Sequence, residues 1–213
     1  NLPRYIDSTE PEDIHTIDGH LRGGIPARDL DALERYWQVI PSVRAVLFQA
    51  ASRPGYCQLR LPLLEVKPAI FGHAEFTAFN KAANTLFAQW KQANTPRLNA
   101  FAQDGHPKLL IEHLSEDLLA TLRVAPLLDA YDVYQHLMDY WAETMQDDCY
   151  LIAADGWQAA AQPREIRQVK NKDNKLVWPE KHDYKKGKRR FKSDLIPATI
   201  LIARYFAAER DAI

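Results

Sequence analysis

The stretch that decides the fold is residues 127–157, LLDAYDVYQHLMDYWAETMQDDCYLIAADGW. Its large apolar side chains recur every three or four positions, which is the spacing of one face of an α-helix. The acidic side chains lie largely on another face, as in a helix that packs one side against a core. We therefore predict the longest helix of the chain here, beginning near Leu127. Its apolar face comprises Leu128, Tyr131, Tyr134, Met138, Trp141, Met145 and Ile152.

Helical patterns continue toward the N-terminus. Residues 76–90 carry large side chains at helical spacing, which favours a packed face over a cofactor cradle. Ser115, followed by Glu116 and Asp117, is predicted to cap a helix. Residues 26–40 are predicted to form one helix. A capping box at residues 9–12 opens a further helix that should end at the glycine pair at 23–24.

Strand signal is scarce. Residues 56–61 alternate weakly between apolar and polar, and residues 169–177 could form a hairpin around Lys172, Asp173 and Asn174. Residues 195–208 are apolar nearly all round, which is typical of a helix buried on several sides or against a partner. The expected fold class is mainly α: a multi-helix domain with a possible small β-hairpin in the basic segment near residues 165–192.

The 213 residues suffice for one large domain or two small ones. We predict a helical domain over residues 1–162, a basic loop or hairpin over 163–193, and a buried C-terminal helix over 194–213. The first residue is Asn1, and the final residues favour a helix without a Gly, Asn or Pro to end it. Both observations suggest an internal fragment whose last helix is truncated.

Charge is distributed unevenly along the chain. Residues 163–193 hold 12 of the 27 Lys and Arg residues and four of the 28 Asp and Glu residues, which leaves 15 basic and 24 acidic residues elsewhere. The densest part reads KHDYKKGKRRFK, at residues 181–192. Cations interleaved with aromatic rings suit contact with DNA or RNA. A solvated loop and pairing with the chain's own acidic helices remain the alternatives. The candidate DNA-binding residues are Lys185, Lys186, Lys188, Arg189, Arg190 and Lys192.

The pattern points to a cytoplasmic protein without a membrane segment. The longest apolar run is too short and too interrupted to span a bilayer, and no signal peptide is visible. Cys57 and Cys149 are isolated in the sequence, so neither a disulfide framework nor a zinc site is indicated.

No catalytic, cofactor-binding or metal-binding residue can be named from the sequence. The eight glycines never occur as G-x-G, which excludes a dinucleotide fingerprint and a P-loop. Two helical carboxylate–histidine pairs, His113 with Glu116 and Asp132 with His136, lack the further ligands that a metal site needs. The acidic pair at 147–148 beside Cys149 would diverge around a helix.

Four segments carry a resemblance to a known family. They are NLPRYIDSTEPED at 1–13, LRGGIPARDLDAL at 21–33, YDVYQHLMDYWAETMQDDCYLIAADGW at 131–157 and FKSDLIPATILIARYFAAERDAI at 191–213. In this order they resemble the region that follows the catalytic domain in methylation (M) subunits of type I restriction-modification systems. The resemblance covers nearly the whole chain.

The resemblance implies a role in DNA methylation. Such M subunits transfer a methyl group from S-adenosylmethionine to adenine in duplex DNA, using a glycine-rich cofactor motif and an Asn-Pro-Pro-aromatic motif that holds the flipped base. Neither motif is present, since the sequence has no G-x-G and no Pro-Pro. The chain would then be a C-terminal helical region, with S-adenosylmethionine bound by the parent protein only. Whether this chain is itself an enzyme stays open.

The implied partners are the specificity (S) subunit, a second M subunit, the restriction subunit of the full complex, and double-stranded DNA. The competing hypothesis is a freestanding helical module that binds nucleic acid or regulates. A third is a helical hydrolase that depends on a bound metal.

Overall fold

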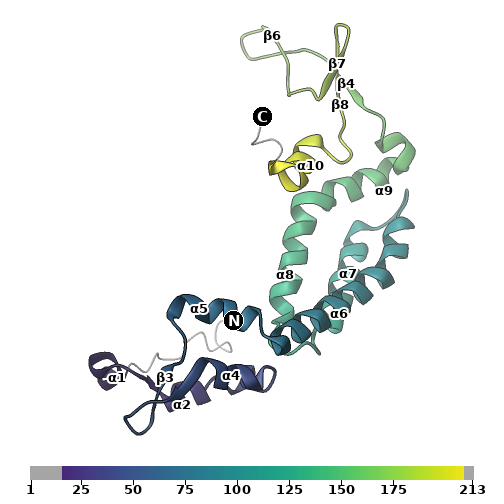
Figure 1. Cartoon of the computed structure of the whole chain (residues 1–213). Coiled ribbons are helices and arrows are strands. Elements are labelled where there is room, and N and C mark those ends of the chain that lie inside the picture. The colour runs from purple at the N-terminus through teal and green to yellow at the C-terminus, as the bar shows by residue number, and fades with distance from the viewer. Residues whose placement is uncertain (1–15, 209–213) are drawn as a thin grey trace, which may run out of the picture. The chain divides into compact units, whose positions relative to one another are not determined.

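The structure is a computed structural model that describes residues 16–208. It is mainly α-helical, with small antiparallel sheets (Figure 1). The chain divides into two compact units, residues 1–82 and 83–213, which we call unit 1 and unit 2. The boundary lies inside helix α6 (Ala74–Asn99). This division differs from the expected helical domain over residues 1–162, because two separate hydrophobic cores form on either side of the boundary.

Unit 1 begins with the short helix α1 (Ile17–Arg22). The expected end at the glycine pair is confirmed: Gly23 has a φ of 74°, a conformation that few residues other than glycine adopt. The expected capping box at residues 9–12 lies outside the described residues. A three-stranded antiparallel sheet follows, ordered β1 (Ile25–Pro26), β3 (Tyr56–Leu59) and β2 (Phe48–Ala50). The weak alternation at 56–61 therefore does mark a strand.

The single helix expected over residues 26–40 is wrong. The structure has two short helices, α2 (Ala27–Asp31) and α3 (Glu34–Trp37), before α4 (Pro41–Leu47). Ile40 precedes a proline, which disfavours the helical conformation, and its φ of −128° lies outside the helical range. The Trp37 indole donates a hydrogen bond to the Leu30 carbonyl at 2.5 Å, so the two short helices fold against each other.

The core of unit 1 lies between α4, α5 (Leu63–Phe71) and the start of α6. Its buried members are on or beside α4, and Phe76 of α6 packs against them. The first part of the predicted stripe at 76–90 is therefore core. The buried residues are Ile40, Val43 and Leu47.

Unit 2 is built around the predicted long helix. The structure places α8 (Ala130–Tyr140), a π-helical segment η2 (Trp141–Met145) and α9 (Gln146–Ala160) in direct succession. The helix begins three residues after the predicted start near Leu127, because the Asp129 side chain caps α8 by accepting a hydrogen bond from the Tyr131 amide at 2.8 Å. Near the other end Gly156 kinks α9, with φ 75° and ψ 161°.

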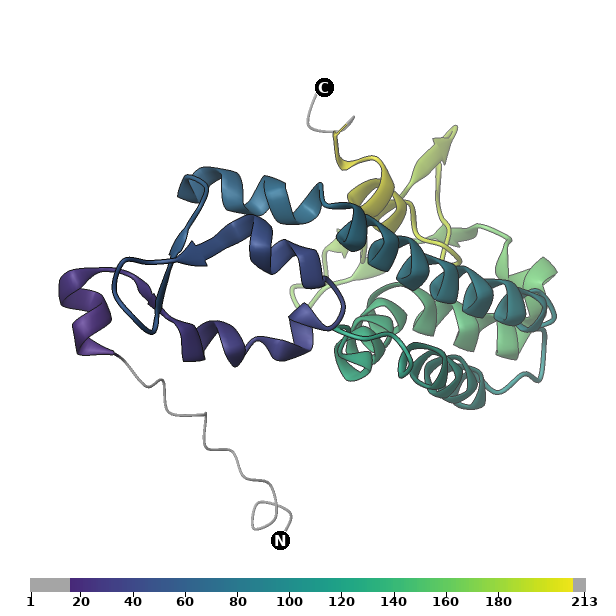
Figure 2. The same ribbon diagram turned by 60° about the horizontal axis from the view of Figure 1, so that its bottom comes forward.

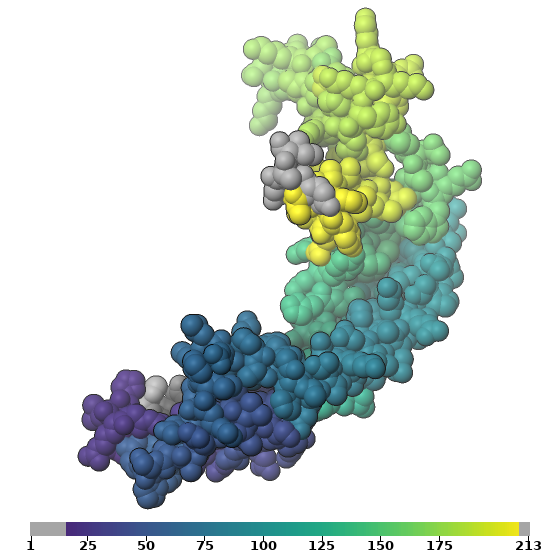
Figure 3. Space-filling model, viewed as in Figure 1, coloured from purple at the N-terminus to yellow at the C-terminus, as the bar shows by residue number. Residues whose placement is uncertain are grey.

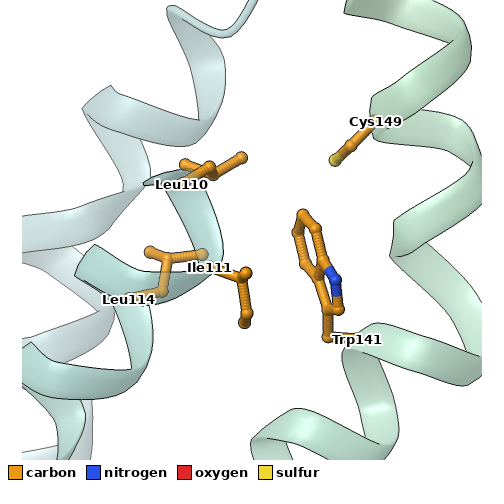
Figure 4. Packing of buried hydrophobic residues seen from close by; sticks show 5 residues of the cluster. All are labelled: Leu110, Ile111, Leu114, Trp141 and Cys149. Atoms are coloured by element: carbon orange, nitrogen blue, oxygen red, sulfur yellow. The ribbon is translucent and has the colours of Figure 1, made fainter. Parts of the chain in front are cut away.

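Helix α7 (Pro107–Leu122) packs along α8 and supplies most of the core of unit 2. Trp141 of η2 is buried against it, and Cys149 of α9 completes the cluster (Figure 4). The second half of α6 runs alongside α7 (Figure 2), where the Trp90 indole donates to the Leu114 carbonyl at 3.1 Å. Trp90 thus extends the predicted stripe into this second core.

Ser115 does not cap a helix, which corrects the prediction. Helix α7 begins eight residues earlier, at Pro107, and a proline is well suited to the first position of a helix. Ser115 is buried in the middle of the helix, where its hydroxyl donates to the Glu112 carbonyl at 3.1 Å. The acidic residues that follow it therefore lie mid-helix and do not complement a helix N-terminus.

The last described helix is α10 (Ala198–Tyr205). It differs from the predicted buried helix, because none of its residues is buried. Only Leu195, which precedes it, joins a core cluster, together with Ile152 and Ala160. The apolar character of this segment therefore does not come from burial in the core. In the described part of the chain, no helix is long and apolar enough to cross a bilayer.

Candidate nucleic-acid interface

The basic segment follows α9 and forms a small sheet of its own (Figure 1). In the space-filling view its atoms are the yellow-green ones at the top (Figure 3). The strand order is β4 (Arg164–Ile166), β8 (Arg189–Lys192), β7 (Tyr184–Lys186), and both pairings are antiparallel. A second hairpin joins β5 (Val169–Lys170) and β6 (Leu176–Val177). The hairpin predicted over residues 169–177 is confirmed, and the segment near 165–192 is a hairpin structure rather than an open loop.

Strand alternation divides the candidate residues between the two faces of the β7–β8 hairpin. Arg190 and Lys192 share a face with Ile166, since Arg190 lies opposite Ile166 in the register. On this face the Arg190 guanidinium sits 3.8 Å from the centre of the Trp178 ring. Lys192 Nζ donates to Glu180 Oε2 at 2.6 Å. These two cations hold the segment 178–180 against the sheet.

The opposite face carries a pair of stacked rings. Tyr184 and Phe191 are register partners, with centroids 5.3 Å apart and planes 13° from parallel. Arg189 lies on this face as well, with its Nε 3.6 Å from Glu165 Oε1. Lys186 is the register partner of Arg189 and extends the same face. We call this set the stacked face: Tyr184, Lys186, Arg189 and Phe191.

Four of the six candidate cations are exposed, namely Arg189 and the three lysines Lys185, Lys186 and Lys188. None of the three lysines makes an ion pair with a residue that the structure describes. Lys188 lies at the tip, in a two-residue loop between β7 and β8 whose first residue, Gly187, has a φ of 63°. A glycine with positive φ at this position suits the right-handed twist of a hairpin. The turn therefore places Lys188 at the tip of the hairpin, two residues after Lys186 and next to Arg189.

Further exposed cations lie on the second hairpin, and the sequence reasoning did not name them as site residues. Lys170 is on β5, and Lys172 and Lys175 flank the turn before β6. Asn171 shapes this turn by accepting hydrogen bonds from the Asp173 and Lys175 amides. These lysines belong to the 12 basic residues counted over 163–193, and this count was the signal by which they could have been named as candidate site residues.

The charge of the segment also acts on His182, between the two hairpins. Partial desolvation lowers the pKa of its imidazole, and the positive charges of Arg190 and Lys185 lower it further. The positive charges that contribute to this lowering of the pKa, unlike the desolvation, would also attract a phosphate. The site therefore has the electrostatic character of an anion-binding surface.

Charge pairing in this segment is local. The carboxylates that pair with its cations are Glu165 and Glu180 within the segment and Asp194 just after it. Across residues 16–208, no cation of the segment pairs with the acidic residues of α8 or α9. Of the two alternatives to nucleic-acid contact, pairing with the acidic helices therefore finds no support in these contacts.

The residues that resemble metal or catalytic motifs lie in ordinary surroundings. His113 and Glu116 are exposed on α7, and Asp132 and His136 are exposed on α8. Cys149 points into the core, where burial raises the pKa of its thiol to about 11. Among the described residues, no group of three or more His, Cys, Asp or Glu side chains could hold a metal ion.

Comparison with protein-family models, curated proteins and solved structures finds no match for this chain.

Proposed function

We propose that this chain is the C-terminal helical region of an M subunit of a type I restriction-modification system, and that its basic segment contacts the backbone of duplex DNA. The parent protein would transfer a methyl group from S-adenosylmethionine to adenine. The helical units would serve assembly with the S subunit and a second M subunit, and would help to enclose the DNA. The four sequence segments that resemble the family support this assignment.

The observation that carries the DNA contact is the trio of exposed, unpaired lysines on the β7–β8 hairpin. No described carboxylate pairs with Lys185, Lys186 or Lys188, so their charges are available to a partner. Lysines bind DNA phosphates through charge, and contacts to phosphates position a protein without reading sequence. Arg189, Arg190 and Lys192 take a different role, since they hold the hairpin together.

A second candidate function is a freestanding module that binds nucleic acid. The observation that favours it is the stacked face, where Tyr184 is 46% exposed beside Phe191. Exposed rings next to cations bind unpaired bases by stacking. The two functions differ in what precedes Asn1. An M subunit requires a glycine-rich cofactor motif and an Asn-Pro-Pro-aromatic motif encoded upstream, and a freestanding module does not.

The test is the salt dependence of DNA binding, measured by fluorescence anisotropy with a short duplex of random sequence. The variant replaces Lys185, Lys186 and Lys188 together by Ala. Each lost phosphate contact lowers the slope of log affinity against log salt by about 0.9, so the slope should fall by roughly 2 to 3. The loss should be equal on any duplex sequence.

A matched control replaces three exposed helix cations of the same unit, Lys91, Lys108 and Arg123, by Ala. This variant has the same net charge as the hairpin variant, so it should keep the wild-type slope if the contact is local. Equal slopes for the wild type and the hairpin variant would contradict the proposal. Tighter binding to single strands than to duplex would instead favour the freestanding module.

A further inference from the structure

A cavity of about 430 Å³ lies inside unit 2, between the π segment η2 and helix α10. Small-molecule sites in proteins have about 300 to 1,000 Å³. Both helices that border it belong to unit 2, and α10 lies beside the junction of α8 and α9 (Figure 1). None of the residues that line this cavity lies in the basic segment 163–193, so the cavity is independent of the proposed DNA contact.

The walls of the cavity are mostly apolar and aromatic. Aliphatic side chains come from α9 and the segment before α10, and rings come from Phe101, Tyr140 and Trp157. Tyr140 and Tyr205 form one polar end, and further polar residues of the lining are Asn99, Thr144 and Asp148. The hydroxyls of Tyr140 and Tyr205 lie 3.0 Å apart, so one donates to the other and keeps one proton for a further acceptor. A few polar groups in an apolar pocket are what fixes the orientation of a bound ligand.

The backbone is unusual on both sides of the cavity. Helix geometry changes to π over Trp141–Met145, and Thr144 and Met145 of this segment line the cavity. Single π turns inside α-helices occur frequently at functional sites. On the facing side Ile196 has a φ of 49°, which is strained for a β-branched residue. Its amide donates to Asp148 Oδ1 at 3.0 Å, so a cavity-lining carboxylate holds the strained residue in place.

Two polar contacts tie α10 over this opening. Tyr205 meets Tyr140 as described, and Arg204 pairs with Glu143 of the π segment. Yet no residue of α10 is buried, and Leu201, which lines the cavity, is 37% exposed. The helix is held over the cavity without filling it, so its apolar side chains could form further contacts with a ligand in the cavity.

The lining also selects the charge of an occupant. None of the residues that line the cavity, all of which the structure describes, is a lysine, arginine or histidine. The guanidinium of Arg204 lies 4.8 Å from the centre of the Tyr140 ring, outside the lining, and it is already paired with Glu143. An anionic ligand such as a phosphate or sulfonate would therefore meet no free cation in the lining, and it would face Asp148. Because burying an unpaired charge is costly, an anion is disfavoured.

From the cavity, its polar end and the cover formed by α10, we infer that unit 2 binds a small uncharged aromatic ligand between η2 and α10. Its ring lies among Phe101, Met145 and Trp157, and a hydrogen-bonding group on it, such as an N–H or an acceptor atom, meets the Tyr140–Tyr205 pair.

N-Phenyl-1-naphthylamine, an uncharged aromatic amine whose fluorescence rises in apolar surroundings, serves as the probe. Saturable binding with one probe per chain is expected. The chain has two methionines, so labelled methyl groups give an internal control. Met145 lines the cavity, whereas Met138 packs in the core and does not. The probe should shift the Met145 methyl signal and leave that of Met138 in place. Binding that is not saturable, or shifts of equal size, would overturn the inference.

Two matched variants on one helix locate the site. Leu201→Trp fills the cavity, and it should weaken probe binding by about tenfold or more. Ile202→Trp is the same change on the neighbouring residue, which does not line the cavity, and it should bind as the wild type does. Equal affinity for all three proteins would overturn the site. If Leu201→Trp proves unfolded by circular dichroism, Tyr205→Phe replaces it, and this variant must weaken binding while Ile202→Trp does not.

The charge of the ligand is tested with 8-anilinonaphthalene-1-sulfonate, the probe's close analogue with an added sulfonate. It should bind to this site more weakly than the uncharged amine by about tenfold or more. Equal or tighter binding of the sulfonate, with a shift of the Met145 methyl signal, would overturn the assignment of an uncharged ligand.

Discussion

Glu180 joins the parts of the basic segment at a single carboxylate. Arg164 of β4 donates to one of its oxygens at 2.5 Å and Lys192 of β8 donates to the other at 2.6 Å. Arg164 also binds Asp194 at 2.6 Å and 2.9 Å, so four charges meet around two strands. The hydrogen bond from Arg164, followed by that from Lys192, lowers the pKa of Glu180 from 4.5 to about 2. The hydrogen bond from Arg164 lowers the pKa of Asp194 as well.

We predict that the basic segment opens in acid. The pKa of Glu180 is lower in the folded chain than its ordinary value, so its stabilising effect is complete above about pH 4.5 and is lost as the pH falls toward 2. Asp194 acts in the same direction. The ring signals of Tyr184, followed by NMR as the pH is lowered, should keep their native shifts until this window and change within it.

Two variants separate Glu180 from general acid effects. Glu180→Gln removes the charge, so the Tyr184 ring signals should already depart from their native shifts at neutral pH. These shifts should also depend less on pH below 4.5. Glu116→Gln changes an exposed carboxylate on α7 and should behave as the wild type does. An unchanged acid transition in Glu180→Gln would mean that other groups hold the hairpin.

At the scale of an element, α10 is rich in apolar side chains and yet has no buried residue. Phe206, just after the helix, is 53% exposed, whereas Leu195, just before it, is 7% exposed and packs with Ile152. The attachment of this segment to unit 2 therefore depends on its first residue and on polar contacts, and less on the helix itself.

This arrangement predicts unequal costs for two truncations of apolar side chains. Leu195→Ala should lower the free energy of unfolding of unit 2 by about 2 to 5 kcal/mol, since it opens a cavity in a core cluster. Phe206→Ala should change it by about 0.5 kcal/mol or less, as at other exposed sites. Urea unfolding followed by circular dichroism measures both. Similar losses would show that the exposed end of the segment contributes to the core.

The elements that sequence reasoning predicted well are those with local causes. Asp129 caps α8 through its own backbone neighbourhood, and the hairpin at residues 169–177 follows from turn residues next to one another. The errors have both local and non-local causes, because sequence reasoning overlooked the proline signals at residues 41 and 107 and could not include tertiary contacts. Ser115 has the chemistry of a cap, but Pro107 starts the helix earlier, and the packing against α8 buries Ser115. Tertiary contacts decided that position.

The candidate site could be predicted only in outline, for a similar reason. Charge density and aromatic content identified the segment. Which cations would be free depends on strand register, since Lys192 reaches Glu180 and Arg190 reaches Trp178 only once β8 lies between β4 and β7. The cavity had no local signal at all. Its polar end joins Tyr140 to Tyr205, which are 65 residues apart in the chain.

At the scale of the whole molecule, the two units have cores that share no buried residue. Leu47 lies in the core of unit 1 and Leu114 in that of unit 2, each 2% exposed. Helix α6 contributes Phe76 to the first core and Trp90 to the second. Each core can therefore lose its packing without removing a contact from the other.

We predict that the two units unfold in separate steps. Leu47→Ala and Leu114→Ala are the same truncation, and each should cost about 2 to 5 kcal/mol in its own unit. In scanning calorimetry, each variant should shift one of two transitions to lower temperature and leave the other in place. If either variant instead shows a single transition that shifts as a whole to lower temperature, α6 couples the two units into one cooperative unit.

The π segment also affects how the chain tolerates changes in length. A π turn closes its hydrogen bond over one residue more than an α turn does. Deleting a single residue between Trp141 and Met145 should therefore restore regular α-helical hydrogen bonding. A deletion elsewhere in the helix would change the register of the residues that follow and would leave the π turn in place. The gain in regularity would have a cost in position, because each residue removed turns all that follows by about 100° around the helix axis. Cys149 and Ile152 would rotate out of the core they now occupy. The burial of the side chains that follow the π segment therefore requires that the segment keeps its present number of residues.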